Sequence, residues 1–253
     1  ATYRVIPYPA ESPIHPGGAH ALVTNPWSAA PGNATSLKWH NNGTSDFNIT
    51  RGNNVFSQED RNADNVPGAP AASSSTIDPL NFDFTPNYTI TPTQTTPNRN
   101  QQFATTNLFY WNNIIHDLSY QYGFDEVSGN FQASNQGRGG AGNDYVIADA
   151  QDGSGTNNAN FATPADGSSG RMQMYLWSGN PQKDGDLDNG VISHEFAHGI
   201  SNRLTGGPSQ SACLQNAEQM GEGWSDYFGL MYTQNWATAT LTTGYSSPRA
   251  VGV

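Results

Sequence analysis

Two histidines four residues apart, with a glutamate directly after the first, are the residues of this sequence that point most directly to chemistry. They lie in the segment His194-Glu195-Phe196-Ala197-His198. In an α-helix, residues four apart are separated by about 400° of rotation, so both imidazoles lie on one face and can bind one zinc ion. Glu195, rotated by about 100°, lies beside the metal. The alternative is a helix with two solvated histidines.

A catalytic zinc site also needs a third protein ligand and an open position for water. Glu222 and Asp226 are again four residues apart and share a face of another predicted helix. Glu222 is predicted to bind zinc. Asp226 is predicted to accept the distal N–H of a ligating histidine, most simply His194, which fixes its tautomer. Because Glu218 precedes Glu222 by the same spacing, a solvated acidic helix face is the alternative.

The elements that must position these residues can be predicted from periodicity and turn signals. The first hundred residues are rich in turn chemistry and favour short strands joined by long loops. From about 104 to 122, apolar residues recur every three or four positions, which predicts a helix. Residues 144–149 and 171–177 are strand-like and suggest a sheet.

The helix that carries the two histidines has a recognisable start and end. Asp188 or Asn189 can cap its N-terminus. Arg203 lies in its last turn, and Gly206-Gly207 provides a left-handed C-cap. The helix of Glu222 and Asp226 is predicted to begin near Glu218.

A calcium ion is a possible second cofactor. Asp184, Asp186 and Asp188 alternate in the turn before the histidine helix, and oxygen-rich loops suit Ca²⁺. Capping of that helix explains the same carboxylates.

Composition excludes several classes of protein. The 253 residues carry a formal net charge of −11, which argues against a nucleic-acid or anionic-membrane binder. No run of 18 apolar residues is present, so no membrane span is expected. The single cysteine, Cys213, excludes an internal disulfide framework and a cysteine-rich zinc module. The first residues lack a signal-peptide pattern, so this start is expected to be internal or processed, and the composition fits a secreted protein.

The sequence resembles the fungalysin family of secreted zinc metalloendopeptidases, more distant relatives of thermolysin. The resemblance lies in HEFAHGISNRLTGG at 194–207 and GEGWSD at 221–226, and upstream in 1–3, 106–113, 123–124, 129–132, 171–177 and 184–187. It implies that His194, His198 and Glu222 hold zinc, that Glu195 is the general base, and that Asp226 supports a zinc ligand.

The resemblance also implies an α+β, thermolysin-like fold. Residues 1–188 would form the β-rich N-terminal part of the catalytic domain, and 189–253 the zinc-binding helices and the beginning of a mostly helical C-terminal domain. A peptide substrate would add as an extra strand along an edge strand before the zinc helix, with Asn158 and Ala159 as backbone-binding positions. A polar turn in an Asn-rich loop is the alternative for these two residues.

The implied activity is hydrolysis of peptide bonds in proteins by a zinc-activated water. The implied partners are protein substrates, an inhibitory propeptide and the protein's own C-terminal continuation. The family's oxyanion-stabilising histidine would lie after Val253, so the sequence is expected to be one portion of a longer mature enzyme, and could be inactive alone. Cys213 could pair with a cysteine in that continuation or simply be buried. A module that binds carbohydrate or protein through its β-rich surface is the competing function.

Overall fold

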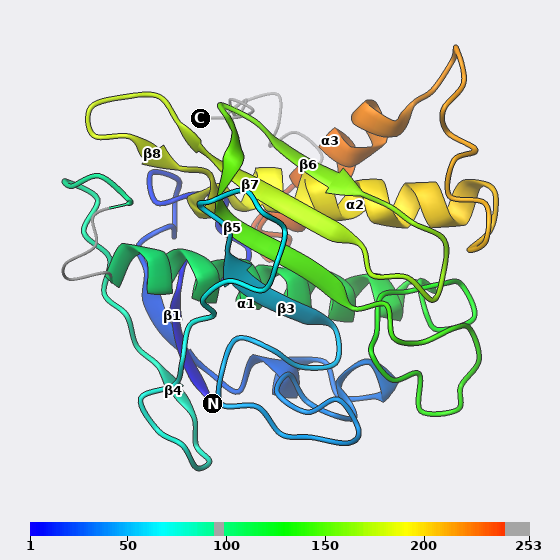
Figure 1. The fold of residues 1–253 in the computed structure, drawn as a ribbon, viewed down its shortest axis with the longest axis horizontal. Coiled ribbons are helices and arrows are strands. Elements are labelled where there is room, and N and C mark those ends of the chain that lie inside the picture. The colour runs from blue at the N-terminus through cyan, green and yellow to red at the C-terminus, as the bar shows by residue number, and fades with distance from the viewer. Residues whose placement is uncertain (94–98, 241–253) are drawn as a thin grey trace.

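The structure, a computed structural model, describes residues 1–93 and 99–240 (Figure 1). The strands are β1 (Thr2–Val5), β2 (Ala21–Thr24), β3 (Val55–Glu59), β4 (Asn81–Phe82), β5 (Val146–Thr156), β6 (Ala159–Ala162), β7 (Arg171–Trp177) and β8 (Lys183–Asp184). The helices are α1 (Arg99–Gln121), α2 (Asn189–Thr205) and α3 (Gly221–Tyr232), with short 3-10 turns η1 (Pro26–Ala29), η2 (Asn33–Thr35) and η3 (Gly185–Leu187). The fold class is therefore α+β, as expected. The end of the predicted second part, 241–253, lies outside the described residues.

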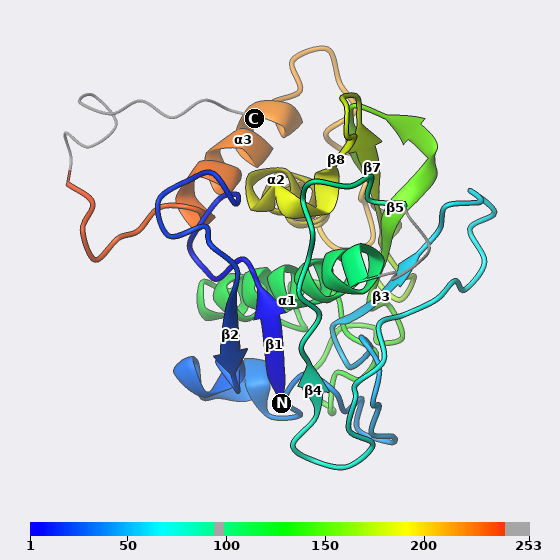
Figure 2. The same cartoon turned by 90° about the vertical axis from the view of Figure 1, so that its left-hand side faces the viewer.

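Helix α1 lies between two sheets (Figures 1 and 2). One sheet has the strand order β2-β1-β4. The other has the order β3-β5-β7-β6, in which β3, β5 and β7 are parallel, β6 runs antiparallel at one edge, and β8 pairs with β7. Helix α2 lies beside α1, and α3 packs on α2. Among the described residues, no helix combines the length and the apolar character that a membrane crossing requires.

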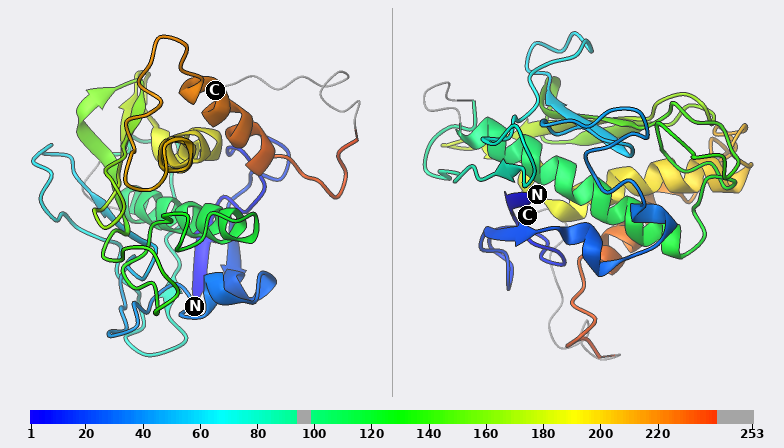
Figure 3. Two further views of the ribbon diagram at one scale, coloured as in Figure 1. Left: turned by 90° about the vertical axis from the view of Figure 1, so that its right-hand side faces the viewer. Right: turned by 90° about the horizontal axis from the view of Figure 1, so that it is seen from below.

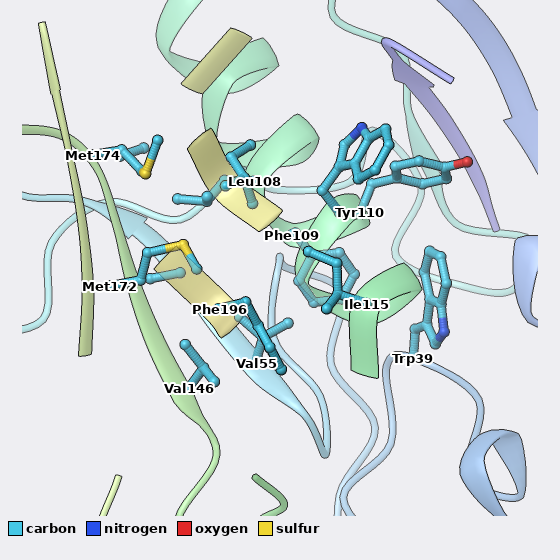
Figure 4. Close-up of a cluster of buried hydrophobic side chains, with 14 of the residues drawn as sticks. Trp39, Val55, Leu108, Phe109, Tyr110, Ile115, Val146, Met172, Met174 and Phe196 are labelled. Atoms are coloured by element: carbon cyan, nitrogen blue, oxygen red, sulfur yellow. The ribbon is translucent and has the colours of Figure 1, made fainter. Parts of the chain in front are cut away.

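The predicted apolar stripe of the first helix is buried, and the helix begins five residues earlier than periodicity indicated. Leu108, Trp111 and Ile115 have no exposed surface. Figure 4 shows side chains of α1 meeting those of the larger sheet and of α2, including Met172 and Phe196. Burying one such side chain stabilises the fold by about 1.5–3 kcal/mol, so this shared core fixes α2 against the sheet.

Side chains from distant segments hold the start of α2. The sequence left Asp188 and Asn189 open as the capping residue, and the structure assigns Asp188, whose Oδ1 accepts from the N–H of Val191 at 3.1 Å. Asn189 instead donates through Nδ2 to the carbonyl oxygen of Ala10 and accepts from Nδ2 of Asn107. The first turn of α2 is therefore bonded both to the N-terminal segment and to α1.

The end of α2 is held by Arg203, whose guanidinium is completely buried (Figure 3, left, views the molecule from this end). The sequence predicted this arginine only as a favourable charge in the last turn. In the structure its Nη1 pairs with the buried carboxylate of Asp144 at 2.6 Å, and the group lies 4.0 Å from the ring centre of Phe131. Its remaining N–H groups donate to carbonyl oxygens in loops 129–130 and 164–168. These bonds join α2 to the loop that follows β6.

Replacing Arg203 should therefore destabilise the fold severely. Arg203→Met leaves the Asp144 carboxylate buried without its partner, so we expect the free energy of unfolding to fall by about 3–5 kcal/mol. Arg4→Met is the control, because the pair of Arg4 with Asp83 is partly exposed and should contribute at most about 1 kcal/mol. Urea unfolding of the two variants measures both changes. Equal midpoints would show that Arg203 does not anchor α2.

Candidate metal centre

The two histidines predicted to bind metal lie on one face of α2 and point toward α3. His194 and His198 are one helical turn apart, and their Nε2 atoms are separated by 3.1 Å. Both side chains are mostly buried, with 20% and 17% of their surface exposed. Burial lowers the pKa of His198, which favours the neutral imidazole that a metal ligand must be.

Helix α3 reaches this face through its smallest side chains. Its buried residues are Gly221, Ser225 and Gly229, which are spaced four apart. A Cβ atom at Gly229 would lie only 3.1 Å from the carbonyl oxygen of Gly190 on α2. Two of its larger apolar side chains, Trp224 and Tyr227, are instead 39% and 57% exposed. The small residues allow the backbones of α2 and α3 to approach closely.

This approach brings the predicted third ligand to the histidines. Oε2 of Glu222 lies 3.1 Å from Nε2 of His194 and 3.5 Å from Nε2 of His198. Three ligands of a tetrahedral zinc ion, at metal distances of about 2.0–2.2 Å, are about 3.3–3.5 Å from one another. The triangle of ligand atoms in the structure therefore has the size that zinc requires. The Glu222 side chain is 78% exposed among the described residues, so the centre is open on that side.

Asp226 lies where the sequence predicted it. Its Oδ1 is 2.8 Å from Nδ1 of His194, close enough to accept the ring N–H. This tautomer leaves Nε2 of His194 as an acceptor that faces the Oε2 of Glu222 and the Nε2 of His198. If Nε2 of His198 is also unprotonated, these three acceptor atoms repel one another until a positive charge lies between them. The donor set thus fits a divalent cation, and its two imidazoles and one carboxylate match the preference of zinc.

Glu195 is not a member of this converging group, and only 5% of its surface is exposed. Burial, with a further contribution from the negative charge of Glu222, raises its pKa to about 8. No hydrogen bond from another described residue lowers that pKa. A cation held by the three ligands would act in the opposite direction and favour the ionised carboxylate.

The structure places the other predicted site residues at the edge of the larger sheet. Ala159 is the first residue of β6, and Asn158 precedes it and is exposed. Among the described strands, β6 pairs only with β7, and it packs beside α2. A free backbone edge therefore lies next to the helix that carries His194 and His198.

The acidic turn before α2 acts as a series of caps. Asp184 accepts from the backbone N–H of Asp186, and Asp188 caps α2. These three carboxylates are not among the groups of described residues whose oxygens converge closely enough to hold one ion. Calcium binding at this turn stays a prediction.

A converging set of buried carboxylates that the sequence did not reveal lies between β3 and β5. It comprises Asp60, Asp149 and Asp152. Arg171 forms an ion pair with Asp149, Gln173 donates to Asp152, and backbone N–H groups of a following loop donate to Asp60. Because protein donors occupy these oxygens, we interpret the set as structural.

Comparison with known proteins connects this geometry to a family. The family profile described as Fungalysin metallopeptidase (M36) matches residues 2–251. The chain belongs to the fungalysin family. It is 46% identical over 231 residues to the extracellular metalloproteinase MEP of Pyricularia oryzae, covering 90% of this chain and 35% of that protein. An extracellular metalloproteinase MEP of Fusarium vanettenii is also 46% identical, over 230 residues. Extracellular metalloproteinase 2 of Trichophyton tonsurans is 43% identical over 231 residues.

The family assignment confirms the resemblance seen in the sequence, and the α+β fold agrees with the thermolysin-like architecture expected of a fungalysin. A metallopeptidase family also implies a metal, and the group formed by His194, His198 and Glu222 could hold one. The chain spans about a third of the length of these relatives.

Asp226 provides a test of the metal centre that leaves its three ligands unchanged. Asp226→Asn retains the shape of the side chain but removes the charge beside His194, so we expect zinc affinity to fall by about 10–100-fold. Chelator competition with the purified protein measures this affinity. Glu218→Gln is the matched control, because Glu218 is exposed and lies before α3. Equal losses of zinc affinity in both variants would indicate that zinc is attracted by an acidic surface in general rather than by a site that includes Asp226.

Proposed function

We propose that this protein is a secreted zinc-dependent endopeptidase that hydrolyses peptide bonds of proteins. The observation that carries the proposal is the triangle formed by Nε2 of His194, Nε2 of His198 and Oε2 of Glu222, with sides of 3.1–3.5 Å. The names of the relatives, extracellular metalloproteinases, support both the activity and the secretion.

In this proposal His194, His198 and Glu222 hold the zinc ion. When bound there, zinc supplies a Lewis acid that polarises a carbonyl group and lowers the pKa of water to near 7. Asp226 holds His194 in the tautomer that presents Nε2. The one-sided exposure of Glu222 leaves room for solvent and substrate at the fourth position.

Glu195 acts as the general base. It follows His194 directly, so the helix holds its carboxylate near the reacting water without directing it into the ligand triangle. Glu195 accepts a proton from the attacking water and delivers it to the amine nitrogen as the peptide bond breaks. The lack of a hydrogen bond to it from another described residue keeps its oxygens available for these transfers.

The substrate binds in extended form along β6. The edge of β6 that no other described strand pairs with offers backbone N–H and C=O groups beside α2. Asn158 and Ala159 are the positions we propose for the first of these bonds. Strand addition reads the peptide backbone, so many sequences can be bound.

We further propose that the protein works with a C-terminal continuation and is made with an inhibitory propeptide. The greater length of the relatives supports this. So does the outer side of α3, where Trp224, Tyr227 and Leu230 are 39%, 57% and 41% exposed, an apolar surface that a further domain could cover. Cys213 is exposed, and it could pair with a cysteine of that continuation.

Substitution of Glu195 separates metal binding from catalysis. We expect Glu195→Gln to retain about one zinc ion per complete molecule and to lose kcat by at least about 10²–10⁴-fold, because the amide cannot accept the proton. Metal analysis and casein hydrolysis measure the two quantities.

The comparison variant is Glu222→Gln, which should lose most of the zinc together with the activity. Full hydrolysis by Glu195→Gln would contradict the proposed role of Glu195. Hydrolysis that survives complete removal of zinc would contradict the proposed function.

A further inference from the structure

A cavity lies beside the beginnings of α1 and α2. Both of these helix ends face the viewer in Figure 2. Its volume is about 470 Å³, within the range of sites that bind small ligands or side chains. Its walls come from five separate segments: 12–14, 86–92, 100–103, 177–178 and 182–188. None of the proposed zinc ligands lines it.

Aromatic rings form much of the wall. Tyr88 and Phe103 are in edge-to-face contact, with ring centres 6.4 Å apart, and Trp177 lies on the side of the larger sheet. Ile14 is 73% exposed at this cavity, and Tyr88 is 39% exposed. Such exposed apolar groups around a cavity are typical of a binding surface.

Two nearly buried carboxylates also line the cavity, Asp184 at 7% and Asp188 at 9% exposure. Burial, together with the charge of Glu11, raises the pKa of Asp188 to about 6. Burial, together with the charge of Asp184, raises the pKa of Tyr88 to about 12. Two basic residues lie in or near the cavity: Lys183 lines it but is exposed to solvent, and the imidazole of His15 lies 3.5 Å from the carboxylate of Glu11. The cavity thus combines aromatic faces with negative charge, a combination that attracts an ammonium or guanidinium group.

The cavity lies close to the proposed path of the substrate. Asp188 precedes His194 by six residues, which is about 9 Å along α2. The other wall, Trp177, adjoins the beginning of β6, because the N–H of Asn157 donates to the carbonyl oxygen of Leu176 and the N–H of Ser178 donates to Oδ1 of Asn157. An extended chain covers about 9 Å in three residues.

We propose that this cavity is a substrate subsite for a lysine or arginine side chain about three residues from the scissile bond. The aliphatic stem packs against Tyr88, Phe103 and Trp177, and the cationic group lies near Asp184 and Asp188. The inference rests on the proposed peptidase function and adds a preference for basic residues far from the cleaved bond.

Matched peptides test the subsite with the complete, zinc-loaded enzyme. Two series of peptides differ in one residue, which is lysine in the first series and norleucine, of similar length but uncharged, in the second. Within each series this residue is placed in turn at each position two to four residues before or after the scissile bond. At one position about three residues from the scissile bond, we expect kcat/KM to be about tenfold higher for the lysine peptide than for the norleucine peptide. The difference should come from a lower KM. Equal kcat/KM values for the two series at every position would overturn the proposal while leaving the peptidase function intact.

Two variants connect the preference to the cavity. Asp188→Asn retains a capping side chain but removes a charge, and Tyr88→Ala removes an aromatic wall, so each should reduce the lysine-to-norleucine ratio to about threefold or less. Tyr122→Ala is the control, since Tyr122 is 89% exposed and does not line the cavity; it should leave the ratio unchanged.

An unchanged ratio in both cavity variants would show that another surface recognises the lysine. If no peptide is cleaved, the proposed function fails. In that case, calorimetric measurement of the binding of the same peptides to the wild type and to Tyr88→Ala shows whether the cavity binds the lysine side chain. Weaker binding of only the lysine peptide to the variant would support the subsite, and equal binding would refute it.

Discussion

The close packing of α3 on α2 is the constraint on which the candidate metal centre depends. It is made possible by the stripe of Gly221, Ser225 and Gly229, since larger side chains there would separate the helices. Glu222 and Asp226 each follow a member of this stripe, so they lie at the edge of the helix contact and reach His194. An increase of even an ångström in the separation of the helices would enlarge the ligand triangle beyond the reach of one zinc ion.

Helix α2 must itself be fixed for that packing to be reproducible. Asp188 and Asn189 hold its first turn, Arg203 holds its last turn, and Phe196 fastens its middle to the core. The histidines are therefore mounted on a segment bonded at both ends. Metal sites need such support because a ligand misplaced by about 0.5 Å already weakens binding and catalysis.

The part of this arrangement that sequence could predict is local. The spacing of His194 and His198, and of Glu222 and Asp226, places each pair on one helical face whatever the rest of the chain does. The cap of α2 and the strands β5 and β7 could also be predicted from the sequence, because they depend on residues that are neighbours along the chain.

What sequence could not predict depends on contacts between distant residues. Arg203 appeared to be an ordinary residue at a helix end, but its partner Asp144 is 59 positions away. The buried face of α3 was also missed, because hydrophobic periodicity draws attention to Trp224 and Tyr227 rather than to glycine. The cavity beside α2 has no signal in the sequence at all, since five segments build it.

Glu195 shows why a buried, poorly compensated group can mark function. Its carboxylate is desolvated and lies within the field of Glu222, and both effects disfavour its ionised form in the protein without a cation. A glutamine or an aliphatic residue at this position would be easier to bury, so folding alone gives no reason for a glutamate. A cation in the adjacent triangle reverses the balance, because it stabilises the negative charge that a general base needs. In the proposed mechanism, the burial that weakens the fold also couples the basicity of Glu195 to occupancy of the metal centre, and no donor among the described residues competes for its oxygens.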